Sequence, residues 1–330
     1  MVKYIVKRIL LAFLILFGVS LIIYTLVRLM PTDFVDQQFA AQQSQGSVKE
    51  EDIQRLKAIY GLSDNSFWGI IKGYFQWLGN LLRGNLGQSF KYNAPVSKVI
   101  SDNMWTSFFI AFIALIFQFL IAIPLGVTAA THQYSARDYA VTVFTMIGIS
   151  FPSFFFAAIL IKVFAVDLGW FPIQGMADAS STETGGLMYF FDNIHHIILP
   201  IFTLVVLSIG SLMRYTRTNT LEVLNADYIR TARAKGLKES KVIYKHAFRN
   251  TLIPLVTLLA GILPTLFSGA MIIEQVFSLP GIGNLAYKAQ IAGDIPFIMG
   301  YNMFLAVLSV LGTLLSDIMY VVVDPRVKLT

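Results

Sequence analysis

The sequence predicts an all-α polytopic membrane protein with six transmembrane helices, on three observations. Hydrophobic residues make up 56% of the 330 residues, charged residues only 13%, and the mean hydropathy is +0.66. Soluble domains carry about 25% charged residues, so this chain has too little polar surface for a soluble globule. Six apolar stretches reach the ~20 residues that a helix needs to cross a hydrocarbon core about 30 Å thick. These stretches are 9–30, 104–130, 139–166, 196–215, 251–273 and 298–323.

The first stretch, 9–30, follows the basic residues Lys3, Lys7 and Arg8. A signal peptide has an apolar region of only ~7–15 residues, so we expect 9–30 to be retained as a transmembrane helix. The chain has no cysteine, which excludes disulfides, thiol catalysis and Cys-ligated metal centres.

The distribution of Lys and Arg predicts the orientation of the six spans. Besides the long segment 31–103, these residues concentrate on the side that holds both termini, whereas 167–195 and 274–297 together carry only Lys288. We therefore expect both termini to be cytoplasmic. The formal net charge of +6 then follows from topology, and no nucleic acid partner is needed to explain it.

The segment 31–103 is the least hydrophobic part of the chain and is predicted to be extracytoplasmic. Its Gln-rich stretch 37–49 predicts a flexible loop, and a capping-box pattern at Ser47 begins a helix that ends at Gly61. A second helix is predicted over 67–82, where aromatic residues indicate the membrane interface or packing on the bundle. This segment is either a lid or docking surface for an extracytoplasmic partner, or simple packing over the outer mouth.

The cytoplasmic segment 214–250 does not have the composition of a linker. A spacing of three or four residues separates Leu221, Leu224, Tyr228, Ala232 and Lys235 along the chain, which predicts a helix. Gly236 is expected to end this helix in a left-handed C-cap. A second short helix is predicted from Lys238 onward. The segment is either a docking element for a soluble partner or a basic loop attracted to anionic lipid.

The same segment carries motifs of a known family. The stretch LNADYIRTARAKGL at 224–237, followed by HAFRNTLIP at 246–254, resembles the coupling loop of ABC-importer permeases, in particular the B-type subunit of the oligopeptide/dipeptide/nickel family. Further motifs fit that family in the same order and extend the resemblance over nearly the whole chain. They are YGL at 60–62, GNLGQS at 84–89 before Pro95 and Val96, EQVFSLPGIG at 274–283, Asp294-x-Pro296, and DPRV at 324–327.

Two departures from the family pattern are visible. Arg230, Thr231 and Ala232 stand where the general permease loop has Glu-Ala-Ala. The stretch MPTDFVD at 30–36 is longer and more polar than the common Pro-Gly-Asp-Pro, and the Gln-rich insert follows it.

The resemblance implies the type I ABC-importer permease fold, in the cell membrane of a prokaryote. The cytoplasmic N-terminus and the first helix are expected at 1–30, and an extracytoplasmic segment at 31–96. The permease domain is expected at 97–323 and contains helices 2–6 and the coupling loop 216–250. A cytoplasmic tail follows at 324–330.

The resemblance also implies that the chain is the transmembrane permease subunit of an ABC importer, which forms half of a translocation path. The implied partners are a homologous second permease in a heterodimer, two cytoplasmic ATPases, an extracytoplasmic solute-binding protein and membrane lipids. Oligopeptides or dipeptides are the expected substrates, with nickel or other metal chelates and oligosaccharides as alternatives. A standalone channel or secondary transporter is the alternative of another class.

We expect the chain not to be an enzyme. It lacks the G-x-x-x-x-G-K-[ST] motif that cradles phosphates, so ATP and Mg are expected on the partner ATPases and no cofactor on this chain. His195 and His196 have only Asp192 as a nearby carboxylate, and we interpret them as an interfacial polar pair rather than a metal site.

Two sets of candidate site residues result. The set implied to couple to the ATPase is Asp227, Tyr228, Arg230, Thr231, Ala232, Arg233, Ala234, Lys235, Gly236 and Leu237. The path or gate set is Glu274, Pro280, Gly281, Gly283 and Asp317. Asp317 lies inside the last predicted span, where an ionisable residue is a functional candidate, and one hydrogen bond within the bundle is the alternative. Prolines inside predicted spans are expected to kink them, as hinges or as fixed bends.

Overall fold

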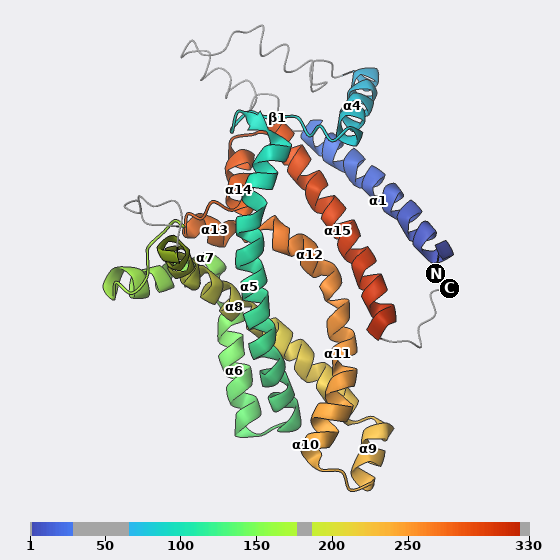
Figure 1. Cartoon of the computed structure of the whole chain (residues 1–330), viewed down its shortest axis with the longest axis vertical. Coiled ribbons are helices and arrows are strands. Elements are labelled where there is room, and N and C mark those ends of the chain that lie inside the picture. Colours follow the sequence, from blue (N-terminus) through green and yellow to red (C-terminus); the bar gives the residue numbers. More distant parts are fainter. Residues whose placement is uncertain (1, 29–65, 177–186, 324–330) are drawn as a thin grey trace. The chain divides into compact units, whose positions relative to one another are not determined.

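The computed structural model describes residues 2–28, 66–176 and 187–323 (Figure 1). The capping-box helix predicted before Gly61, the Gln-rich loop and the predicted tail 324–330 lie outside these residues. The described helices are α1 (Val2–Arg28), α4 (Phe67–Leu82), α5 (Val96–Thr131), α6 (Ala136–Ser150), α7 (Ser153–Leu160), α8 (Leu187–Leu224), α9 (Asp227–Ala234), α10 (Glu239–Lys241), α11 (Phe248–Thr257), α12 (Leu259–Ser268), α13 (Met271–Val276), α14 (Ile282–Ile291) and α15 (Ile295–Val323). Two π-helical segments, η1 (Ile161–Asp167) and η2 (Val242–Ala247), continue α7 and α10.

Short strands β1 (Gln88–Ser89) and β2 (Ala94–Pro95) pair antiparallel, with Gln88 opposite Pro95. The chain divides into two compact units. Among the described residues, the first takes in 2–28, 66–105 and 285–311, and the second takes in 106–176, 187–284 and 312–323.

Each of the six predicted spans is largely helical in the residues that the structure describes. Three helices of the described part are long and apolar enough to cross a membrane, namely Val96–Thr131, Asp192–Leu224 and Ile295–Asp317. A fourth span results if the bent pair Ala136–Ser150 and Ser153–Asp167 is counted as one, and Leu10–Leu26 and Gly261–Val276 are shorter apolar helices.

Two of the predicted spans are broken, where the sequence predicts continuous helices. The third bends by 100° between α6 and α7, where Phe151 has extended backbone and Pro152 stands before the first residue of α7. The fifth is divided at Leu258 and again at Gly269, whose φ of 73° is left-handed. Proline inside a span therefore does not act uniformly, because Pro124 and Pro200 lie within continuous helices.

The first unit has a small core between α1 and α4. The predicted helix 67–82 is confirmed as α4, and its N-cap Ser66 accepts a hydrogen bond from the Gly69 N–H at 3.1 Å. Tyr74 stacks edge-on against Tyr24 at 5.5 Å, and its hydroxyl lies 2.8 Å from Ser20 Oγ. This packing faces α1, whereas Trp68 on the same helix is 76% exposed.

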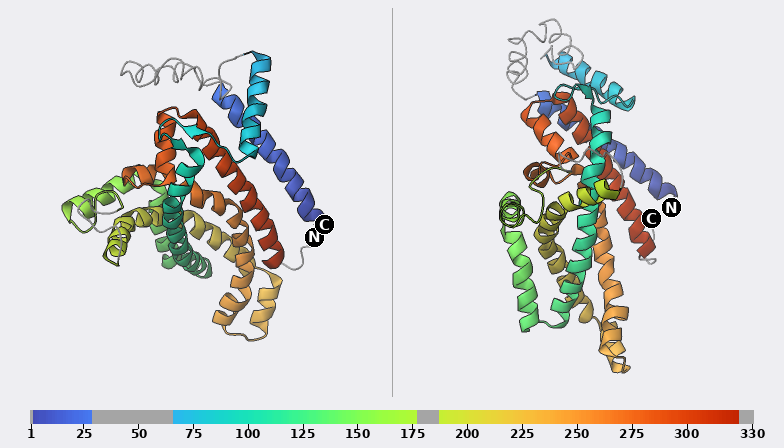
Figure 2. Two further views of the ribbon diagram at one scale, coloured as in Figure 1. Left: turned by 45° about the horizontal axis from the view of Figure 1, so that its top comes forward. Right: turned by 60° about the vertical axis from the view of Figure 1, so that its left-hand side comes forward.

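In the second unit, α6 and α8 lie side by side (Figure 2) because glycines let their backbones approach. A Cβ on Gly148 would lie 2.2 Å from the Val206 carbonyl oxygen. Close approach of backbones at small residues is a common device for packing helices in membranes. At the other end of this contact, the Arg217 guanidinium donates two hydrogen bonds to the Asp138 carboxylate, at 2.8 and 2.7 Å.

Candidate functional sites

The first candidate site is the loop between α8 and α11. Helix α9 ends at Ala234, and Gly236 follows with a φ of 72° while its N–H donates to the Arg233 carbonyl. The predicted helix–glycine–helix order is therefore confirmed. The predicted continuity from Leu221 to Lys235 is wrong, because α8 ends at Leu224 and α9 begins at Asp227.

The break between α8 and α9 has a local cause. The Asn225 side chain donates to the Leu221 carbonyl at 3.0 Å, and Ala226 adopts extended backbone with ψ of 149°. Asparagine side chains compete with the helical backbone in this way. The spacing of apolar residues carries no information about such a break.

A small apolar core holds α9 against η2. Its buried members are Ile229, Ala232, Val242 and Ala247. Sequence reasoning places Val242 on the apolar side of the second short helix but misses Ile229, its partner in this core. The signal for Ile229 is a β-branched residue three positions before Ala232.

An ion pair spans the glycine turn. Arg233 Nη2 lies 2.7 Å from Glu239 Oε1. The hydrogen bonds that Arg233 donates hold the pKa of the Glu239 carboxyl below its ordinary value, and they raise the pKa of the Arg233 guanidinium. Both side chains are about half exposed, so the pair fixes the turn more than it stabilises the fold.

The remaining residues of the predicted coupling set separate into an outward and an inward group. Ala232 is buried and Leu237 is half-buried, so these two serve the internal packing. The outward group presents one aromatic ring, two acceptor groups and a basic surface to solvent. Its exposed members are Asp227, Tyr228, Arg230, Thr231, Arg233, Ala234, Lys235 and Gly236.

The second candidate site is a buried polar node around Glu274, which is 2% exposed. Its carboxylate accepts from the Ser107 hydroxyl at 2.6 Å, from the Asn284 N–H at 2.9 Å and from the Ala270 N–H at 3.2 Å. Ser107 Oγ in turn accepts from the Ile282 N–H at 2.9 Å. The node therefore joins α5, the start of α13 and the start of α14.

Gly281 and Gly283 are part of this node. A Cβ on Gly281 would lie 2.3 Å from Glu274 Oε2, and one on Gly283 would lie 3.0 Å from the same oxygen. Pro280 is exposed on the turn before them. The structure thus brings Glu274, Gly281 and Gly283 together as an internal anchor, while Asp317 lies half-buried on α15 and takes no part in the hydrogen bonds named above.

The histidine pair is divided between two environments. His195 Nε2 lies 2.8 Å from the Trp170 carbonyl oxygen, and the buried His196 lies 3.5 Å from Asp192 Oδ1. Within the described ranges, no three His, Cys, Asp or Glu side chains gather closely enough to hold a metal ion.

Comparison with known proteins decides the family. Residues 122–329 match the family described as binding-protein-dependent transport system inner membrane component, and residues 1–111 match its N-terminal family. The chain belongs to this permease family. The resemblance inferred from its motifs is thereby confirmed, as is the membrane-spanning, multi-pass class.

Relatives of this permease match it over their full length. The oligopeptide transport system permease protein AppB of Bacillus subtilis is 38% identical, with 99% of this chain and 100% of the relative covered. The oligopeptide transport system permease protein OppB of Haemophilus influenzae is 33% identical over the same shares. A putative peptide transport system permease protein of Brucella abortus is 35% identical over 99% of both chains.

A solved structure shares the fold of this permease. It is titled as inward-facing conformations of the MetNI methionine ABC transporter, and it aligns with a TM-score of 0.52 at 17% identity. The alignment covers 69% of this chain and 97% of the other. The predicted fold class, a polytopic helical permease of ABC-importer type, is therefore confirmed.

Proposed function

We propose that this permease is the transmembrane subunit of an ABC importer for oligopeptides or dipeptides. The observation that carries the proposal is the full-length identity of 38% and 33% to two oligopeptide transport permeases. The chain contributes half of the path and no covalent chemistry.

We place the loop from α9 to η2 in the cytoplasm, together with both termini, because Lys and Arg concentrate there in the sequence. The partners are a homologous second permease, two ATPases that hold ATP and Mg, and an extracytoplasmic solute-binding protein. The tight fold of the loop, seen at the end of α11 in Figure 2, suits a docking element better than a lipid-bound linker.

Force transmission through this loop follows from its packing. The exposed Tyr228, Arg230 and Lys235 form the surface that meets the ATPase. Ile229 and Ala232, on the other side of α9, pack against η2, which continues directly into α11. A push on α9 therefore moves α11, and the energy comes from the different affinity of ATP for the two states of the ATPase pair.

The test uses the complete transporter in proteoliposomes with its binding protein. Arg230→Glu combined with Lys235→Glu should abolish import of a labelled pentapeptide and its stimulation of ATP hydrolysis, because both changes reverse charge on the docking surface only. Arg137→Glu is the control, since it reverses the charge of an exposed arginine in the first turn of α6, away from α9.

Normal import by the double variant would refute the docking role of α9. Absence of import of both a labelled pentapeptide and a labelled dipeptide by the unaltered transporter, with ATP hydrolysis intact, would refute the peptide substrate.

A further inference from the structure

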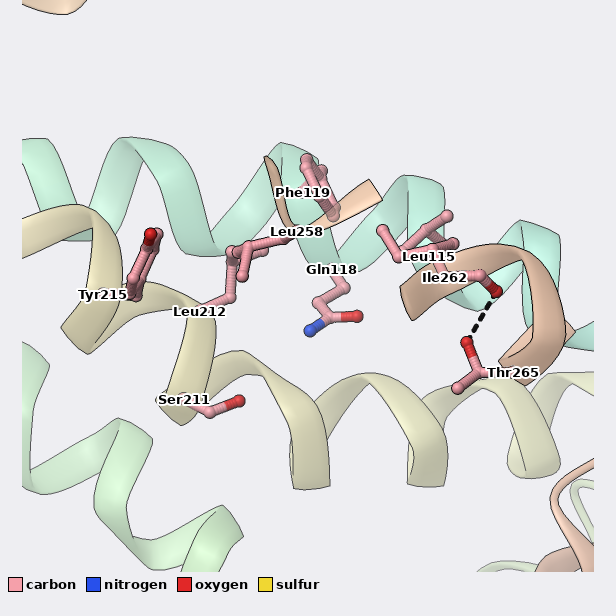
Figure 3. Close-up of a pocket in the computed structure, with 9 residues that line it drawn as sticks. All are labelled: Leu115, Gln118, Phe119, Ser211, Leu212, Tyr215, Leu258, Ile262 and Thr265. Atoms are coloured by element: carbon pink, nitrogen blue, oxygen red, sulfur yellow. Dashed lines mark hydrogen bonds between the residues drawn. The ribbon is translucent and has the colours of Figure 1, made fainter. Parts of the chain in front are cut away.

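A cavity of about 370 Å³ lies among α5, α8 and α12, within the second unit (Figure 3). Cavities of roughly 300–1,000 Å³ are typical of small-molecule sites. Every residue that lines this one is uncharged, and the walls are largely apolar, with Leu115 and Phe119 from α5 and Ile262 from α12. Four polar side chains interrupt these walls: Gln118, Ser211, Tyr215 and Thr265.

The cavity lies beside the division of the fifth predicted span. The division at Leu258 separates α11 from α12, and each of these helices contains a proline, Pro254 and Pro264. Leu258, at the start of α12, and Ile262 and Thr265 within it stand three or four residues apart and line the cavity together with side chains from α5 and α8.

The hydrogen-bond inventory makes the cavity rich in acceptors. The hydroxyls of Thr265 and Ser211 donate to main-chain carbonyls, at 2.7 Å to Ile262 and 2.9 Å to Ser208. The Tyr215 hydroxyl lies 3.4 Å from the Pro254 carbonyl oxygen. The hydroxyl hydrogens of Thr265 and Ser211 are thus used, while the lone pairs of all three oxygens can still accept.

Gln118 adds to this surplus of acceptors. Its Nε2 donates one of its two hydrogens to the Ser208 carbonyl at 3.2 Å, so the amide oxygen remains as an acceptor beside one further N–H donor. Figure 3 shows this side chain reaching from α5 into the space beside α8 and α12.

A ligand that matches this cavity must bring hydrogen-bond donors without a net charge. An ion would lose its hydration and gain no opposite charge from the lining residues. The main chain of a peptide brings N–H donors at every residue, whatever its side chains are, and the apolar walls suit side chains of many kinds.

We propose that this cavity is a transit subsite that holds the main-chain N–H groups of a peptide against Gln118, Ser211, Tyr215 and Thr265. The inference rests on the proposed peptide-import function. It adds to that function a place on this chain that the peptide occupies and the chemical groups by which it is recognised.

The absence of native cysteine allows a direct test by cross-linking in the reconstituted transporter. The probe is a pentapeptide whose central cysteine is activated as a pyridyl disulfide. During ATP turnover it should couple to Leu115→Cys and Ile262→Cys, which line the cavity. Leu120→Cys is the matched control, because Leu120 is on α5 and 64% exposed, outside the cavity.

Coupling at both lining positions, with little at Leu120→Cys and with competition by unlabelled pentapeptide, supports the subsite. Equal coupling at all three positions, or none at the two lining positions while the cysteine-free transporter imports the peptide, overturns the subsite and leaves the proposed function standing. Failure of the cysteine-free transporter to import any peptide overturns the proposed function and the subsite together.

A second measurement separates recognition from structure. Import of a pentapeptide is compared with import of its analogue that is N-methylated at the main chain. The wild-type transporter should import the unmethylated peptide faster than the methylated one. Gln118→Leu should reduce the ratio of these two import rates roughly fivefold, the change expected on loss of one neutral hydrogen bond. A purely structural role for Gln118 would reduce both rates equally and leave the ratio unchanged, which would overturn the assignment.

Discussion

A single added methyl group tests whether Glu274 is held as described. In Gly281→Ala, the new Cβ would lie 2.3 Å from Glu274 Oε2 and 2.6 Å from Ser107 Oγ. Neither group can withdraw without breaking hydrogen bonds, because three donors hold the carboxylate and Ser107 also accepts from the Ile282 N–H.

The magnitude follows from these contacts. Overpacking of a well-filled interior costs about 1–3 kcal/mol, and breaking one hydrogen bond to a charged group costs about 1.5–3 kcal/mol. The free energy of unfolding of Gly281→Ala should therefore fall by roughly 2.5–6 kcal/mol, which lowers the melting temperature by roughly 5 °C or more.

The assay is thermal unfolding of the purified transporter in detergent, followed by intrinsic fluorescence. Gly79→Ala on α4 is the control, because no atom lies within 4 Å of its added Cβ and alanine favours a helix over glycine. If Gly281→Ala melts as high as Gly79→Ala, the description of the Glu274 node is refuted.

Three further predictions concern other contacts. Arg217→Met removes the partner of the buried Asp138 and should reduce the free energy of unfolding by about 3 kcal/mol. Arg230→Met removes an exposed ion pair and should change this free energy by less than about 1 kcal/mol. Equal melting temperatures of the two variants would contradict this difference. Ala232→Glu places a carboxylate in the contact between α9 and η2 and should speed tryptic cleavage at Lys235, and its exposed neighbour Ala234→Glu should not; similar cleavage of both would argue against a packed loop. Because Arg233 lowers the pKa of the Glu239 carboxyl, the contribution of this ion pair is present above the ordinary glutamate pKa and is lost only as the pH falls through the lowered pKa. The amide-exchange difference between wild type and Glu239→Gln should therefore hold from about pH 8 to 5, and its loss within that range would contradict the pairing.

Structural features that depend on residues close together in the sequence could be predicted from the sequence. The apolar stretches predict the spans, the aromatic run predicts α4, and Gly236 predicts the left-handed turn, because in each case the deciding residues are neighbours along the chain. The family motifs predict the same permease that the comparisons find.

Contacts between distant residues could not be predicted in this way. Ser107 and Glu274 are 167 residues apart, and no periodicity relates them. The 100° bend before α7 is not marked by its proline alone, because Pro124 and Pro200 lie within continuous helices. The break at Asn225 is local, but it comes from a side-chain hydrogen bond to the Leu221 carbonyl, which the spacing of apolar residues does not encode. The cavity beside Gln118 needs the juxtaposition of three helices, which a single sequence does not reveal.

The glycine contact between α6 and α8 determines how far a small rotation of α8 would displace both helices. From Pro200 to Leu224, α8 is about 37 Å long at 1.5 Å per residue. A rotation of only about 8° about Pro200 would carry the Leu224 end through roughly 5 Å, close to one helical pitch. The close backbone contact at Gly148 and the Arg217–Asp138 ion pair tie α6 to α8. Both helices would therefore rotate together, and a rotation of a few degrees would displace their far end by about the length of one helical turn.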